Sequence, residues 1–418
     1  MSTVFFPRLL QPRLETALED TPVVLIHGPR QCGKTTLAQV VAELKGYEYL
    51  TFDDINLVEA ARADPVGFID RLGSKIVLDE VQHVPELFRS IKLAVDTQRI
   101  PGQFLLTGSA NVLLLPQLSE SLAGRIEILP MLPLARCEVE TRNAGLLEYL
   151  LKRNFNIQSE GRLGARLEKI VTLGGYPEPL MRKNTQRRLR WHQNYIETIV
   201  QRDIRELARI SNLEAIPRIL ELAALQSGQL LNMSRIAAPF KLSRPTVAAY
   251  FSLLQNVFLL DVLPAWHGNR GKRLIKTPKV HMVDTGLAAA LLGANEKSLS
   301  GNRKLLGQLL ESFVYNELQR QASALDSDLS FYHFRDKDQY EVDIVIEQPG
   351  VGLMGIEVKA SATVRESDFR GLKRLKVTAG AEFNLGVILY DGDRVLAFGE
   401  NLLALPISTL WGTVGASV

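Results

Sequence analysis

The chain has 418 residues, of which 46% are hydrophobic and 23% are charged, and its formal net charge is +3. This length predicts two to four domains, and the composition is typical of a soluble globular protein. The two cysteines, Cys32 and Cys137, exclude a disulfide framework, and the small net charge does not by itself indicate nucleic-acid binding.

We expect a reducing compartment, the cytoplasm, and no membrane partner. The chain starts without a recognisable signal peptide, so export is not expected. Residues 100–119 carry no formal charge, but proline, glycine, asparagine and glutamine interrupt this run. A membrane-spanning helix is therefore not predicted there.

The first motif is a glycine-rich loop between an apolar strand and a helix. The run Val23–Ile26 precedes Gly28-Pro-Arg-Gln-Cys-Gly-Lys-Thr35, and Thr36–Val41 continues as a helix. This is the phosphate-binding loop pattern in its proper context. Backbone N–H groups and the helix N-terminus would surround phosphate oxygens. The alternative is a tight turn that holds a lysine by chance.

The loop predicts ATP and Mg²⁺ as ligands. Lys34 would reach the β- and γ-phosphates, and the Thr35 hydroxyl would bind Mg²⁺. The residues predicted to contact the nucleotide or its metal are Gly28, Pro29, Arg30, Gln31, Cys32, Gly33, Lys34, Thr35, Thr36, Asp79 and Ser109.

A second apolar strand, Lys75–Leu78, ends in two acids, Asp79 and Glu80. Open α/β sheets bind ligands at the carboxyl ends of their strands. Asp79 would hold Mg²⁺ through water, and Glu80 would orient the attacking water. The alternative is a strand capped by solvated acids. A third strand, residues 103–109, supplies Thr107, Ser109 or Asn111 as a γ-phosphate sensor, or else ends in an ordinary turn.

One arginine is a candidate for catalysis in a neighbouring subunit. Arg125 follows Leu122-Ala-Gly and precedes another apolar run. In ring-forming ATPases, an arginine reaches into the neighbour's site and stabilises charge on the transferred phosphoryl group. The alternative is a surface arginine at the end of a helix.

Several motifs together resemble those of bacterial and archaeal AAA-type ATPases with a C-terminal domain of unknown function. They are residues 28–37, 78–82, 106–111, 122–125, 132–134, 174–177 and 202–204. The similarity runs from about Arg8 into the last domain. It implies an α/β protein with a P-loop AAA-type ATPase core, a helical lid, a winged-helix domain and a C-terminal restriction-endonuclease-like α/β domain. It fixes the architecture better than the cellular role.

We expect the ATPase core in residues 1–140 and the helical lid in 141–212. Apolar residues at helical spacing within 184–207 support the lid. The lid carries a basic cluster that would face nucleic acid, a neighbouring subunit or, more commonly, only solvent: Arg182, Lys183, Arg187, Arg188 and Arg190.

Residues 213–290 are predicted to form the winged helix. Ser243 would cap its third helix, which would enter the DNA major groove with Arg244, Thr246 and Tyr250. Two strands, 257–264 and 274–283, would flank a flexible basic turn at 268–271. The basic residues of this hairpin are Arg270, Lys272, Arg273, Lys276 and Lys279, and the first three are predicted DNA contacts. The alternative is a protein–protein adaptor.

The last domain, residues 300–418, carries a second chemical pattern. Glu311 lies on a predicted helix, Asp343 on one strand, and Glu357 and Lys359 on the next. This order is typical of restriction-endonuclease-like folds. Glu311, Asp343 and Glu357 would bind Mg²⁺ or Mn²⁺, and Lys359 would orient the attacking water. The same fold also serves as a binding or assembly domain.

Two functional hypotheses follow. The first is an ATP-driven enzyme that remodels or translocates duplex or branched DNA as a ring-shaped homo-oligomer, with metal-dependent cleavage as an added activity. The second is a nucleotide-gated switch or scaffold that holds DNA or protein without cutting it. A third reading, a small-molecule kinase, is opposed by the Asp79–Glu80 pair and the long accessory domains.

Overall fold

The computed structural model describes residues 5–109, 112–114, 116–142, 145–153, 157, 159–207, 214–274 and 276–412. Asn111, one of the three candidate γ-phosphate sensors, lies outside these residues. Contacts divide the chain into two compact units, the first formed mainly by residues 1–134 and the second mainly by residues 135–418. Within the described residues, no helix is both long and apolar enough to cross a membrane.

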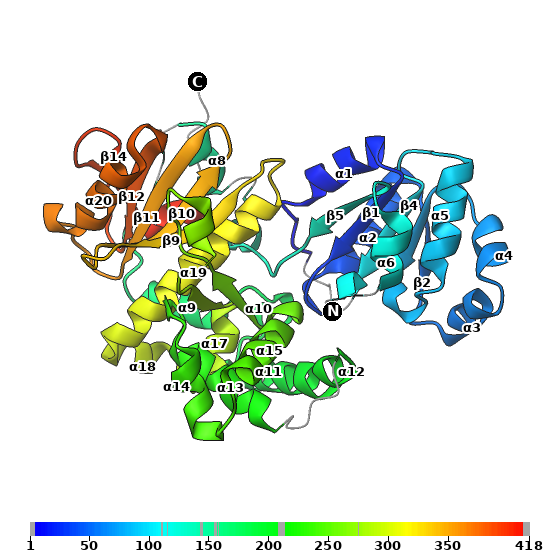
Figure 1. Cartoon of the computed structure of the whole chain (residues 1–418), viewed down its shortest axis with the longest axis horizontal. Helices are drawn as coiled ribbons and strands as arrows, with labels where there is room; N and C mark the ends of the chain where they lie inside the picture. The colour runs from blue at the N-terminus through cyan, green and yellow to red at the C-terminus, as the bar shows by residue number, and fades with distance from the viewer. Residues whose placement is uncertain are drawn as a thin grey trace. The chain divides into compact units, whose positions relative to one another are not determined.

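The first unit is built on a parallel sheet with the strand order β2-β3-β4-β1-β5 (Figure 1). Its strands are β1 (Val23–His27), β2 (Glu48–Thr51), β3 (Ile76–Asp79), β4 (Phe104–Gly108) and β5 (Ile126–Pro130). Its helices are α1 (Gln11–Asp20), α2 (Lys34–Lys45), α3 (Ile55–Ala63), α4 (Pro65–Asp70), α5 (Leu87–Thr97) and α6 (Pro116–Leu122).

Alternate residues of each central strand enter two different cores. Val23 and Leu25 pack with residues of α5, whereas Val24 and Ile26 pack with residues of α1 and α2. A strand buried on both faces is apolar throughout, which is why these strands are continuous apolar runs in the sequence. The carboxyl ends of β1, β3 and β4 meet at one edge of the sheet, where the phosphate-binding loop leaves β1.

The second unit begins with helices. They are α7 (Arg136–Val139), α8 (Leu146–Leu151), α9 (Ala165–Leu173), α10 (Pro177–Leu180), α11 (Thr185–Thr198), a π-helical turn (Ile199–Ile204) and α12 (Arg205–Leu207). Later in this unit come α17 (Thr285–Leu291) and α18 (Glu296–Gly301).

The motif at residues 174–177 wraps around a buried carboxylate. Gly174 has a φ of 67°, and a Cβ atom there would lie 2.1 Å from Oδ1 of Asp284. The backbone N–H of Gly175 donates to Oδ2 of Asp284 over 2.7 Å, and Arg320 pairs with the same oxygen at 3.0 Å. Only glycine allows this close approach, so the motif has a structural role.

The described residues between 215 and 282 form four α-helices and a small antiparallel sheet with the order β6-β8-β7. The elements are α13 (Ala215–Leu225), β6 (Gln229–Leu230), α14 (Met233–Ala237), α15 (Arg244–Asn256), β7 (Leu260–Leu263), α16 (Arg270–Arg273) and β8 (Lys279–Met282). We call this part the helix–sheet segment. Both hairpin strands are shorter than predicted.

The predicted flexible turn between those strands is wrong, because a short helix lies there. Asn269 caps α16, with its Oδ1 accepting from the backbone N–H groups of Gly271 at 2.9 Å and Lys272 at 3.4 Å. The basic residues of this connection are therefore held in a helical turn.

A mixed six-stranded sheet with the order β13-β14-β12-β11-β10-β9 completes the second unit. Its strands are β9 (Ser330–Arg335), β10 (Glu341–Gln348), β11 (Gly352–Lys359), β12 (Phe383–Tyr390), β13 (Leu396–Ala397) and β14 (Leu402–Pro406), and its helices are α19 (Arg303–Ser323) and α20 (Arg370–Ala379). The chain that follows β7 covers the edge strand β9. The Trp266 N–H donates to the His333 carbonyl at 2.6 Å, and the His333 N–H donates to the Pro264 carbonyl at 2.9 Å.

Candidate functional site

The phosphate-binding loop is held in a fixed shape by its neighbours. A Cβ atom on Gly28 would lie 2.0 Å from the Met131 carbonyl oxygen, so only glycine fits there. The Arg8 guanidinium donates to the carbonyls of Cys32 and Leu132, each over 2.7 Å. Gly33 has a φ of 104°, a left-handed conformation that favours glycine. The loop backbone is thus preformed.

The side chains of the loop differ in their accessibility. Pro29 and Cys32 are buried, Arg30 and Thr35 are half-buried, and Gln31 and Thr36 are exposed. The Cys32 thiol points to the Met131 carbonyl, 3.4 Å away. Cys32 therefore contributes its backbone to the loop, while its side chain packs inward.

Lys34 lies inside the loop with only neutral partners. Its side chain is buried, and Nζ donates to the carbonyls of Gly28 at 3.1 Å and Pro29 at 2.8 Å. The ammonium attracts a charged phosphate oxygen more strongly than a neutral carbonyl, because two opposite full charges attract each other. The ammonium is therefore able to exchange these carbonyls for phosphate oxygens.

Asp79 is the centre of the site. Both of its carboxylate oxygens accept from the Thr35 hydroxyl at 3.1 Å, and Oδ2 also accepts from the Tyr49 hydroxyl at 2.7 Å. The Thr107 hydroxyl donates to Oδ1. These contacts join α2, β2, β3 and β4. Oxygen donors from Thr35 and Asp79 fit Mg²⁺, which prefers few protein ligands together with phosphate and water.

Tyr49 is a site residue that we did not predict. It lies on β2, whose Thr51 is paired with Asp79 of β3. Burial, and then the hydrogen bond to Asp79, raise the pKa of the Tyr49 hydroxyl, so it remains a donor. The sequence feature that could have identified Tyr49 is an aromatic residue on a short strand, which pairs in parallel with the strand that ends in Asp79.

Glu80 occupies a left-handed backbone conformation with a φ of 57°. Its backbone N–H donates to the Thr107 hydroxyl at 3.0 Å, and its carboxylate accepts from the Gln82 side-chain amide. The carbonyl of that amide accepts from the Ser109 N–H at 3.3 Å. Gln82, which we also missed, therefore links Glu80 to the end of β4.

His27 ends β1 directly before the loop. Burial, and then the charge of Lys34, lower the pKa of His27 to about 4. The imidazole is therefore neutral at neutral pH, and the positive charge inside the loop belongs to Lys34.

Arg125 lies at the opposite edge of the sheet from the loop. It precedes β5, whose Ile126 is paired with Val23, the first residue of β1. Its guanidinium contacts the Asp96 carboxylate through two bonds of 2.5 and 3.0 Å. Arg125 is thus far from the phosphate-binding loop of its own chain, and its action in a neighbour's site stays a prediction.

Tyr250 does not face a duplex, so its prediction as a DNA contact is wrong. It is buried at 5% exposure, together with Val247, Phe251 and Leu254. This spacing places Tyr250 on the core face of α15. Arg244 is exposed, and the Thr246 hydroxyl lies 2.7 Å from that of Ser243.

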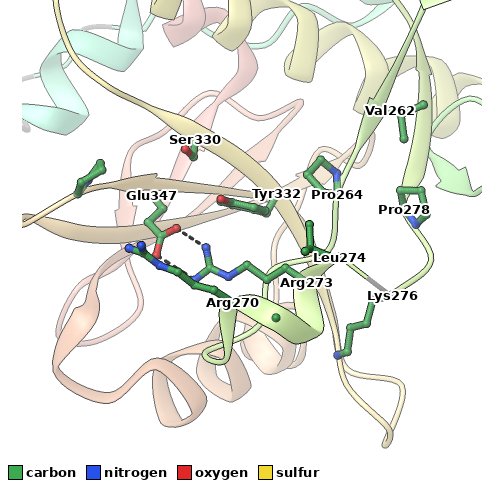
Figure 2. A pocket seen from close by; sticks show the side chains of 12 residues that line it. Val262, Pro264, Arg270, Arg273, Leu274, Lys276, Pro278, Ser330, Tyr332 and Glu347 are labelled. Carbon is green, nitrogen blue, oxygen red and sulfur yellow. Dashed lines mark hydrogen bonds and ion pairs between the residues drawn. The ribbon is translucent and has the colours of Figure 1, made fainter. Parts of the chain in front are cut away.

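Arg273 is also not a free DNA contact, and that prediction is wrong. Its guanidinium forms two bonds of 2.5 and 3.0 Å with Glu347 and lies 4.8 Å from the centre of the Tyr332 ring. Figure 2 shows this pair in a hollow of about 790 Å³, with Arg270 beside Glu347 and Lys276 at the other end. Arg270 and Lys272 are exposed, as a DNA contact requires.

The acidic residues of the last domain do gather, but around a lysine. On β10 and β11, Ile344 is paired with Ile356, so Asp343 and Glu357 lie side by side. The Lys279 ammonium of β8 contacts Glu311 at 2.7 Å, Glu341 at 2.8 Å and Asp343 at 3.1 Å. The Lys359 ammonium contacts Glu357 at 2.8 Å.

The structure does not bring Glu311, Asp343 and Glu357 together as a metal site. No three His, Cys, Asp or Glu side chains in the described residues are placed to hold a metal ion. Two of the predicted ligands are bound to Lys279, and the third is bound to Lys359. The role of Lys359 in orienting water for cleavage depends on that metal and is not supported.

The pKa values of Lys279 and Glu357 in this cluster differ strongly from their usual values. Burial disfavours the charged form of Lys279, but Asp343, Glu311 and Glu341 outweigh burial, and the pKa of Lys279 lies well above its usual value. Burial, and then the charge of Asp343, raise the pKa of Glu357 to about 8. Lys279 is therefore a permanently charged group among carboxylates.

Three family models match the chain. An AAA domain matches residues 20–140, and two domains of unknown function, DUF8612 and DUF4143, match residues 164–298 and 306–410. Uncharacterized proteins of Mycobacterium tuberculosis and Mycobacterium bovis are each 30% identical over 404 residues, covering 96% of this chain and 83% of theirs. The chain belongs to the family of AAA-type P-loop ATPases that carry a C-terminal DUF4143 domain.

Solved structures are more distant. A Walker-type ATPase of Pyrococcus abyssi is 17% identical, with a TM-score of 0.40, and the alignment covers 69% of this chain and 96% of that one. The Holliday junction branch migration motor RuvB of Thermotoga maritima is 18% identical, with a TM-score of 0.29 over 61% of this chain and 89% of that one. Likenesses this weak establish no shared function.

Proposed function

We propose that this chain hydrolyses ATP to ADP and phosphate with Mg²⁺, and that hydrolysis drives an action on DNA. ATP hydrolysis is supported by the contact of the Thr35 hydroxyl with both carboxylate oxygens of Asp79, at 3.1 Å each. The buried Lys34 lies on the same loop and helix. The loop, the Thr35 hydroxyl and the Asp79 carboxylate thus meet at one edge of the sheet.

Each residue of this site would have a distinct task. Lys34 leaves its carbonyl partners and binds the β- and γ-phosphate oxygens, while Thr35 and Asp79 hold the metal. Bound Mg²⁺ neutralises the charge that develops on the phosphates. Glu80 orients the attacking water, and Gln82 fixes the position of the Glu80 carboxylate. Ser109 would contact the nucleotide at the end of β4.

The proposed catalysis is completed by Arg125 from a second copy of the chain. Because Arg125 lies at the far edge of its own sheet, only a neighbouring subunit is able to use it. A homo-oligomeric ring provides that arrangement for every site. Mixing two inactive variants, Lys34→Ala and Arg125→Ala, should then restore part of the ATPase activity, because some interfaces combine two intact halves. If the mixture recovers no ATPase activity, the proposal that Arg125 acts in a neighbouring subunit is contradicted.

The proposed DNA action rests on exposed cations of the helix–sheet segment. Arg244 begins α15 and lines a hollow of about 690 Å³ with Asn232 and Ser234. Arg270 and Lys272 are exposed on α16. Such cations would contact the phosphate backbone, so they favour binding without strong sequence preference. We do not propose that the C-terminal domain cleaves DNA.

The test is ATPase activity with and without duplex, single-stranded and branched DNA. Stimulation by at least one of these DNAs supports the proposal, and Glu80→Gln should reduce turnover about 10²–10⁴-fold while nucleotide binding remains. Lys34→Ala serves as the control for contaminating ATPases. Hydrolysis that no DNA alters would leave the ATPase but reject its coupling to DNA.

A second candidate function is a nucleotide-gated switch or scaffold. It is favoured by the paired acids of the C-terminal sheet, which are not arranged for metal-dependent chemistry. Slow turnover, with different assembly states in ATP and in ADP, would distinguish this function from a motor. Analytical ultracentrifugation in the two nucleotides measures that difference.

A further inference from the structure

Lys279 is the side chain that links the helix–sheet segment to the C-terminal sheet. It begins β8, and its ammonium reaches Glu311 on α19 and both Glu341 and Asp343 on β10. Its side chain is 1% exposed, so water does not share this charge. A lysine is almost never buried to this degree unless it is paired.

The Lys279 ammonium contacts three carboxylates. It donates hydrogen bonds to Glu311 at 2.7 Å and to Asp343 at 3.1 Å. The Glu341 carboxylate lies 2.8 Å from Nζ as an ion pair. Asp343 is fixed further by the Val358 N–H, which donates to its second oxygen at 2.9 Å.

Among the residues that the structure describes, Lys279 is the cation that contacts all three carboxylates. His281 and His333 are both buried, and burial, followed by the charge of Lys279, lowers the pKa of each ring. Arg335 contacts only the outer oxygen of Glu341, at 3.9 Å. Lys279 therefore supplies the positive charge that contacts all three carboxylates, while Arg335 lies beside Glu341 and the charge of Lys359 also acts on Asp343.

Backbone hydrogen bonds of the neighbouring strands hold Lys279 next to the three carboxylates. β8 is paired with β7 from Leu260 to Leu263, and the chain after β7 is bonded to the edge strand β9 through Pro264 and Trp266. The ion pair between Arg273 and Glu347 adds a further link between the same two parts. Removing Lys279 from the acids would require these contacts to separate.

We propose that Lys279 takes the position of a divalent metal in this carboxylate cluster and makes the C-terminal domain a metal-independent partner of the helix–sheet segment. Two of the carboxylates that would ligate Mg²⁺ or Mn²⁺, those of Glu311 and Asp343, are bound to the internal ammonium of Lys279. The cluster then serves as a fixed joint, and loss of the lysine side chain uncovers a divalent-cation site. This inference is independent of the nucleotide site.

The test measures binding of Mn²⁺ alone to the nucleotide-free full chain by electron paramagnetic resonance. We expect Lys279→Ala to bind one more Mn²⁺ per chain than the wild type, and the double variant Lys279→Ala/Asp343→Asn to lose it. Mn²⁺ should raise the melting temperature of Lys279→Ala but not of the double variant. Lys297→Ala, at an exposed lysine of α18 outside the cluster, is the matched control and should behave as the wild type.

Two outcomes would overturn the inference. One is Mn²⁺ binding by the wild type that Asp343→Asn removes, since the ion would then occupy the cluster beside Lys279. This comparison needs no Lys279 variant and decides the matter even if Lys279→Ala does not fold. The other is a folded Lys279→Ala that binds no more Mn²⁺ than the wild type.

Discussion

Lys34 and Lys279 are both buried lysines next to strand ends, yet their partners differ in kind. Lys34 donates to two backbone carbonyls, which are neutral. Lys279 is surrounded by three carboxylates, which have no comparable replacement. The first lysine is free to bind an incoming phosphate, while the second is a permanent counter-ion. The partners of a buried lysine, more than its burial, determine whether it serves a ligand.

The largest expected effect lies at the nucleotide site. Lys34→Ala removes the charge that would hold the transferred phosphoryl group, so ATP turnover should fall about 10²–10³-fold or more. Thermal stability should change little, because the carbonyls that Lys34 contacts lie in the loop and not in the core. Phosphate release and thermal unfolding measure the two effects. Lys45→Ala, an exposed lysine at the end of the same helix, should retain full activity.

At the C-terminal cluster we expect the opposite result, a loss of stability with nucleotide binding retained. Lys279→Met leaves three carboxylates without their counter-ion, which should destabilise the second unit by about 3–5 kcal/mol. The ATPase site of the first unit contains no residue of this cluster, so nucleotide affinity should be retained wherever the protein is folded. Chemical denaturation and nucleotide binding test this pair of outcomes. A variant as stable as the wild type would show that the ion pairs are dispensable.

A smaller effect is expected for the hydroxyl that positions Asp79. Tyr49→Phe removes one hydrogen bond to the carboxylate, worth about 1 kcal/mol, so the affinity for Mg²⁺-ATP should fall roughly fivefold. Titration with a fluorescent ATP analogue measures it. Tyr47→Phe is the matched control, because the Tyr47 hydroxyl donates to the Gly102 carbonyl, away from Asp79. Equal losses in both variants would remove Tyr49 from the site.

The smallest expected effect is on the stability of the folded protein at acidic pH. The pKa of His27 is lowered from 6.5 to about 4, so between these values the unfolded chain binds a proton that the folded chain does not. His27 therefore costs stability as the pH falls from about 6.5 to 4. His27→Gln should show a shallower fall of the melting temperature over this range, by a few degrees. An unchanged slope in a scan from pH 7 to 4 would contradict the neutral imidazole.

Much of the nucleotide site could be predicted because its signals are contiguous. The loop from Gly28 to Thr35 acts through consecutive backbone groups, and Asp79 and Glu80 follow directly after an apolar strand. Parallel strands bring their carboxyl ends together, so these segments meet without further information. Tyr250 was wrongly predicted as a DNA contact, although Val247, Phe251 and Leu254 mark its helical face as buried. Tyr49 and Gln82 were missed, because an aromatic residue on a short strand and a glutamine after two acids are weak signals.

The sequence by itself determined the class of the first unit and the acids of the second, because short motifs and strand periodicity specify both. The tertiary structure alone decided what those acids bind. Lys279 lies 32 residues from Glu311 and 64 from Asp343, and along the chain it belongs to a run of basic residues. A charged side chain takes its role from whichever opposite charges the fold buries beside it, and that choice depends on packing between segments distant in sequence.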